Sequence, residues 1–170
     1  MSISTSALRA LHDVGLAAWF GGGLMGAVGV NSTARRADNL SERHELSAHP
    51  WERWAPVNAA AVGAHLVGAT GLLLTDRDTL AHRPGARRTA LVKGGLTGAA
   101  LALTVLAERR AALVERQAAQ SGAGPDEPGN LSPGDFAHAQ DELRVLRWSV
   151  TGLTGVVLVL GSVQARRSTQ

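Results

Sequence analysis

Apolar residues are gathered along this chain into four long stretches, and the charged residues lie almost entirely between them. The stretches cover residues 7–30, 54–74, 89–107 and 148–163. Each is close to the ~20 residues that a helix needs to cross a hydrocarbon core of ~30 Å. A soluble bundle would instead carry charge along one face of every helix. The pattern predicts an all-α fold, a four-helix transmembrane bundle that forms a single domain over residues 1–170.

The polar connections differ in what they predict. Residues 108–119 and 136–147 continue the third and fourth helices outside the membrane, whereas residues 120–134 are rich in Gly, Pro, Ser and Asn and predict a mobile loop. His49-Pro50 predicts a break before the second crossing, because the residue before a proline disfavours helix. Four crossings place both termini on one side of the membrane, but the Arg and Lys counts do not fix the orientation.

The composition excludes several classes of protein. The sequence pI is about 10.9, yet the net charge is only +3. Arginine supplies all the basic residues except Lys93, and with no Tyr or Cys a small excess of arginine raises the pI steeply. The arginines are dispersed at the ends of the stretches, so we expect no nucleic-acid partner. The absence of cysteine excludes disulfides and thiolate metal sites. We expect a multi-pass protein of a bacterial inner or plasma membrane, with the lipid bilayer as its principal partner.

Small residues recur at intervals of four within the apolar stretches, which is typical of helices that pack closely in lipid. The run at 21–26 spells G-x-G-x-x-G, but it lies inside a predicted membrane helix and not after a strand, so we reject a dinucleotide site. The residues predicted to form packing seams are Ala18, Gly22 and Gly26 in the first helix, Ala60, Ala64 and Gly68 in the second, and Gly94 and Gly98 in the third.

Besides Arg9 near the start of the first stretch, four ionisable residues fall within the apolar stretches: His12, Asp13, His65 and Lys93. An alternating topology places all four in the half of the bilayer nearest the termini. Ionisable groups at such depth are costly and usually face the bundle and pair, so Asp13 and Lys93 form the obvious polar pair. The alternative is that Lys93 extends to the membrane surface while His12 and Asp13 lie among the headgroups. His65 lies deeper, and either binds a ligand or bonds to a carbonyl of a neighbouring helix.

Imidazoles from two helices can hold a copper ion or a haem, so His12 and His65 are the candidate metal and cofactor ligands. A protein without any cofactor is an equally open alternative. We expect no enzymatic activity, because no nucleophile and base stand at suitable spacing. His12 and Asp13 are adjacent and point about 100° apart on a helix, so they do not form a ready catalytic pair.

Several short motifs resemble the copper-resistance D (CopD) type of membrane domain and related small four-helix families of unknown function. They are His12 with Trp19 and Gly21-Gly22, Arg53-Trp54 before a helix ending in Gly68, Thr70 and Gly71, the single Lys93, and Arg147 before the last helix. The resemblance implies a role in copper uptake or tolerance, with His12, Trp19, Thr70 and Lys93 at the matching positions. Unlike that family, this chain is a lone four-helix unit with almost no methionine.

Two functions follow as hypotheses. The first is metal handling or transport through the intramembrane polar cluster. The second is a non-catalytic scaffold or accessory subunit that binds a protein partner through the connection at 108–147, with assembly into a homo-oligomer also open.

Overall fold

The computed structural model describes residues 4–30, 40–120 and 133–167, and these residues form helices joined by single non-helical positions, with no strand among them. The four long helices are α1 (Thr5–Met25), α3 (Leu40–Thr75), α5 (Pro84–Gln120) and α6 (Pro133–Arg167). Two short elements, the π-helical η1 (Gly26–Val30) and α4 (Arg77–His82), follow α1 and α3. The all-α class is therefore confirmed. The predicted mobile loop at 120–134 lies almost wholly outside the described residues.

Local sequence accounts for the helix boundaries. The Ser4 side chain accepts a hydrogen bond of 3.2 Å from the Ala7 amide and so caps the first turn of α1. Pro84 is the first residue of α5, a position where the missing N–H has no intrahelical partner to lose. Pro84 and Gly85 thus stand at the start of a helix, and α4 occupies the connection before it.

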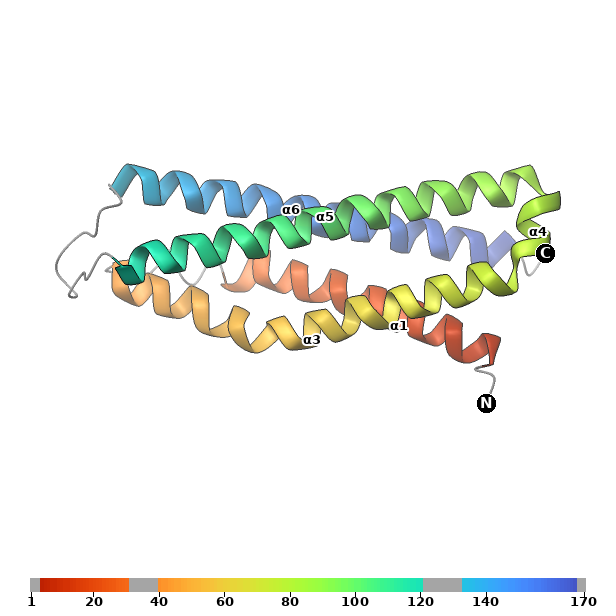
Figure 1. Cartoon of the computed structure of the whole chain (residues 1–170), viewed down its shortest axis with the longest axis horizontal. Coiled ribbons are helices and arrows are strands. Elements are labelled where there is room, and N and C mark those ends of the chain that lie inside the picture. The colour runs from red at the N-terminus through yellow and green to blue at the C-terminus, as the bar shows by residue number, and fades with distance from the viewer. Residues whose placement is uncertain (1–3, 31–39, 121–132, 168–170) are drawn as a thin grey trace.

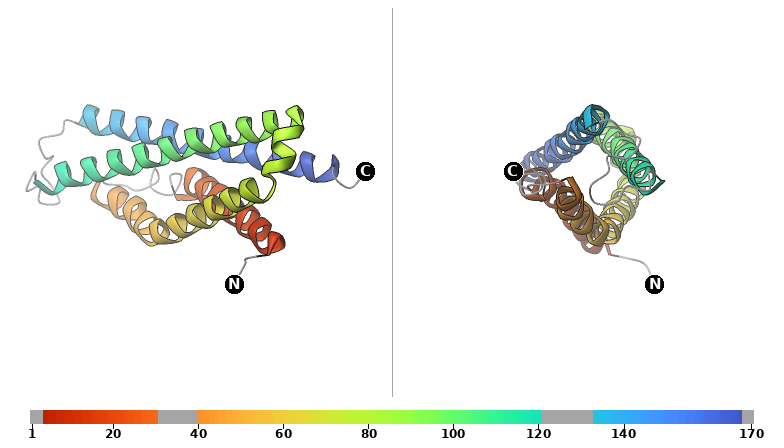
Figure 2. Two further views of the ribbon diagram at one scale, coloured as in Figure 1. Left: turned by 45° about the vertical axis from the view of Figure 1, so that its right-hand side comes forward. Right: turned by 90° about the vertical axis from the view of Figure 1, so that its left-hand side faces the viewer.

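The predicted break at His49-Pro50 is wrong, because α3 runs without interruption from Leu40 to Thr75. Pro50 and Pro56 both lie inside this helix. A proline within a helix removes one backbone hydrogen bond and bends the axis, while the helix can continue on both sides. The first half of α3 is visibly bent in Figures 1 and 2.

The long helices lie side by side in an elongated molecule (Figure 1). Helix α1 packs against α3 on one side and α6 on the other, and α6 packs in turn against α5. Viewed along the molecule, the tilted helices follow the sides of a four-sided outline (Figure 2). Within the described ranges, α3 and α5 do not pack directly on each other. The central core consists of Leu16, Trp19, Ala100, Val150 and Val157.

Three helical segments of the described chain are long and apolar enough to cross a membrane: Arg53–Thr75, Pro84–Val114 and Asp141–Gln164. The predicted crossing at 7–30 is not among them. Arg9, His12 and Asp13 lie in the first turns of α1 and reduce its apolar content. The predicted extensions are helical, since α5 continues to Gln120 and α6 begins at Pro133.

Candidate functional site

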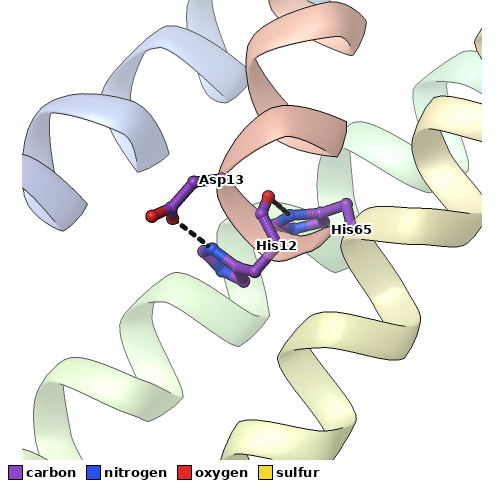
Figure 3. A network of polar contacts seen from close by, with 3 residues as sticks. All are labelled: His12, Asp13 and His65. Atoms are coloured by element: carbon purple, nitrogen blue, oxygen red, sulfur yellow. Dashed lines mark hydrogen bonds and ion pairs between the residues drawn. The ribbon is translucent and has the colours of Figure 1, made fainter. Parts of the chain in front are cut away.

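His65 lies on the face of α3 that meets α1, and only 1% of its surface is exposed. Its Nδ1 is 3.1 Å from the backbone oxygen of His12 (Figure 3). A carbonyl oxygen can only accept a hydrogen bond, so Nδ1 of His65 carries the proton and donates it. In the neutral ring, Nε2 is then left with a bare lone pair. The hydrogen bond from His65 to the His12 carbonyl is one of the two alternatives expected for His65. It leaves Nε2 of His65 open to a ligand.

The two helices approach closely at this point because each presents a glycine to the other. A Cβ atom on Gly15 would lie 2.5 Å from both the Ala61 oxygen and the His65 nitrogen, which is well inside van der Waals contact. A Cβ atom on Gly68 would collide with the backbone of Leu8 and His12. Gly68 belonged to the predicted seam, whereas Gly15 did not. The sequence feature that could have identified Gly15 is its position three residues after His12, on the same side of the helix.

His12 and Asp13 form a hydrogen bond of 2.8 Å between Nδ1 and Oδ1, as Figure 3 shows. The two side chains therefore contact each other although they leave the helix about 100° apart. Their Cβ atoms do point in different directions, but the ring and the carboxylate bend toward each other beyond Cβ. The Asp13 side chain is 65% exposed, while that of His12 is 11% exposed. The exposed carboxylate of Asp13 thus holds the buried His12 ring from outside the pair formed by α1 and α3.

The predicted ion pair between Asp13 and Lys93 is not formed, since Asp13 bonds to His12 instead. Lys93 is half-buried on α5, and its ammonium lies close to Gly161 of α6, where an added Cβ atom would be 3.8 Å from Nζ. Lys93 is nevertheless within electrostatic reach of both Asp13 and His65. The four predicted polar residues are therefore brought into one region, with a different pairing among them.

Aromatic rings extend the site from His12 across His65 to Trp19. The ring centres of His12 and His65 are 4.5 Å apart, and those of His65 and Trp19 are 6.2 Å apart. Trp19 is 2% exposed. Two buried nitrogens in this row, Nε1 of Trp19 and Nε2 of His65, have no hydrogen-bond partner within the described chain. The indole nitrogen is a donor and Nε2 of His65 is an acceptor.

The other predicted packing residues divide into two groups. Gly22 lies beneath the Trp54 indole, Gly26 is buried, and Ala18 and Ala64 are half-buried. Gly94 and Gly98 are exposed, and a Cβ atom on either would meet nothing within 4 Å. These two glycines of α5 therefore form no seam with the part of the chain that the structure describes. Thr70, one of the positions matched by resemblance, is also exposed.

The histidine pair fits a metal ion better than it fits a haem. Two imidazoles on one tetrahedral ion have ring centres about 5 Å apart at the usual metal–nitrogen distances, only slightly more than the 4.5 Å found here. Imidazoles on opposite faces of a haem stand about 6 Å apart, with the macrocycle between them. The two rings are in contact and leave no space for it. Within the described residues, no group of three or more His, Cys, Asp or Glu side chains is arranged to hold a metal ion.

Comparison with protein-family models, with curated proteins and with solved structures yields no match to this chain.

Proposed function

We propose that this chain is a multi-pass protein of the bacterial inner or plasma membrane that binds a transition metal ion, copper first among them, at Nε2 of His12 and His65. The proposal takes α1 as a fourth crossing beside the three apolar spans, because its buried face supplies His12, Leu16 and Trp19 to the bundle. Ionisable side chains are rare and costly in such helices, and those that occur generally serve a site.

One observation carries the proposal: each imidazole has its Nδ1 tied to an oxygen acceptor. His65 donates to the His12 carbonyl, and His12 bonds to the Asp13 carboxylate. Histidines that ligate metals typically use their second nitrogen in this way, which fixes the tautomer and turns the free nitrogen toward the ion. Imidazole nitrogen suits copper and zinc alike. With Nδ1 occupied in this way, the neutral ring of either histidine has its Nε2 lone pair available for a metal ion.

The test is metal analysis of the detergent-purified protein after incubation with Cu²⁺ or Zn²⁺. We expect metal to be retained by the wild type and lost by His65→Ala. His82→Ala is the matched control, since His82 is exposed on α4 and its Nδ1 also bonds to a backbone oxygen, that of Asp78, at 2.8 Å. A wild-type protein that retains neither ion, or a His65→Ala protein that retains as much as the control, would refute the metal site.

The helical extensions favour the scaffold function as a second candidate. Arg110 of α5 and Glu142 of α6 stand 3.9 Å apart, and Leu143 beside them is 5% exposed. The extensions thus form a paired arm that a soluble partner could contact. If the arm is the functional part, shortening the connection at 120–134 will abolish the partner interaction, and His65→Ala will leave it intact.

A further inference from the structure

A pocket of about 40 Å³ lies among the helices on the far side of Trp19 from the histidines. All four long helices contribute to its wall, which includes Trp19, Asn58, Thr104, Glu108 and Arg147. A cavity needs at least roughly 10–15 Å³ to hold one water, so this pocket has room for water. Its wall is mostly apolar, but the amide of Asn58 and the charged groups of Glu108 and Arg147 give water polar partners there.

The pocket lies at the level where the apolar stretches end. Asn58 lies near the start of one predicted crossing, while Glu108 and Arg147 immediately adjoin two others. Helices α3 and α5, which supply Asn58 and Glu108, do not pack directly on each other in the described ranges. The polar ends of these helices are therefore where water would reach the pocket.

Trp19 stands between this pocket and the histidine pair. Its ring lines the pocket and is also in contact range of His65, with ring centres 6.2 Å apart. Along α1, His12 and Gly23 mark the two polar regions, and they are about 16 Å apart at 1.5 Å per residue. The buried side chains Leu16, Ala100 and Val150 surround Trp19 in the core. The indole is thus the largest group that separates pocket water from the bare Nε2 of His65.

We propose that the pocket is a water-filled entrance to the histidine site and that the Trp19 side chain closes it. Water and protons enter as far as Thr104, and the indole stops them before His65. Removal of the indole joins the two polar regions into one hydrated passage through the bundle. This closure requires no metal at the histidines, so its test is independent of the metal site.

The absence of cysteine from the chain makes thiol labelling a direct test. Single cysteines would be placed at Thr104 in the pocket and at Ala100, which is 0% exposed, one helical turn deeper. In the otherwise wild-type protein in sealed vesicles, we expect Thr104→Cys to react with a membrane-impermeant thiol reagent at least about tenfold faster than Ala100→Cys, because thiol reactivity follows exposure. Equal labelling rates for these two cysteines, in protein that retains Trp19, would overturn the proposal.

Proton entry into liposomes tests the closure itself. With a pH-sensitive dye inside and a potassium diffusion potential as the driving force, we expect Trp19→Ala to admit protons faster than the wild type. Trp148→Ala is the matched control, because Trp148 is 45% exposed on α6, away from the pocket wall.

In the Trp19→Ala background, Ala100→Cys should also become reactive toward the thiol reagent. Trp19→Leu replaces Trp19→Ala if the smaller side chain prevents folding. Proton entry no faster than in the control, from a protein with wild-type helix content, would overturn the closure.

Discussion

Glycine 15 illustrates how a single missing methyl group sets the distance between two helices. The backbone of α3 occupies the place where a Cβ atom at this position would lie. We expect Gly15→Ala to lower the free energy of unfolding by roughly 1–3 kcal/mol, the usual cost of overpacking a close contact. Gly94→Ala is the control, because its Cβ atom meets open space and alanine favours helix by up to about 1 kcal/mol. Thermal unfolding in detergent measures both variants, and equal stabilities would contradict the close contact.

Asp13 has a role that depends on the proposed metal site. Its carboxylate holds Nδ1 of His12 at 2.8 Å and leaves Nε2 free. We expect Asp13→Ala to weaken metal binding by about 10–100-fold, the typical effect of losing such a supporting group. Competition titration against a chromogenic chelator measures the affinity. Asp78→Ala, an exposed change on α4, should leave the affinity unchanged. An unaltered affinity in Asp13→Ala would show that His12 needs no support from the carboxylate.

At the scale of the element, the arm formed by the ends of α5 and α6 is held by apolar burial more than by charge. Leu143 is 5% exposed, whereas the side chains of Arg110 and Glu142 are 55% and 43% exposed. We expect Leu143→Ala to cost about 2–5 kcal/mol of unfolding free energy. Arg110→Ala should cost no more than about 1 kcal/mol, because exposed ion pairs contribute little. Denaturant titration would contradict this ranking if the arginine variant were the less stable.

The helices show what sequence can and cannot predict at this scale. Charge segregation identified the positions of α3, α5 and α6 because the apolar lengths needed to cross a bilayer are distinctive. It did not predict that α3 continues through Pro50, since a bent helix and a broken one share the same local sequence. Spacing of small residues marked Gly68 and Gly94 equally. Which of them meets a partner depends on how the helices are rotated and paired, and that is a tertiary property.

The sequence predicted which residues make up the candidate site, but not which of them bond to one another. Depth along the predicted helices brought His12, Asp13, His65 and Lys93 together in one half of the bilayer. The pairing of Asp13 with His12, and not with Lys93, depends on side-chain torsions and on the position of α6 beside Lys93. Pattern alone gave no sign of the pocket, because its wall is assembled from four helices that are distant in sequence.

At the scale of the whole molecule, the number of crossings decides the topology. Residues 4–30, 40–120 and 133–167 contain three clearly apolar spans, and α1 is the fourth under the proposed function. We expect the N-terminus, the C-terminus and α4 to lie on one side of the membrane. The side of the membrane on which each segment lies is measured by labelling single cysteines in sealed vesicles of known orientation. The cysteines would replace Ser2, Thr79 and Ser168. An N-terminal cysteine that reacts from the side opposite to the other two would show that α1 does not cross.

The pairing of helices also has a consequence for how the protein is made. Because α3 packs on α1 but not directly on α5, the first two long helices can complete their mutual contacts before the rest of the chain has been synthesised. Helices α5 and α6 form a second pair that joins the first along the α1 and α6 contact. A gene split after His82 should therefore yield two helical hairpins that insert separately and reassemble when they are produced together in one cell.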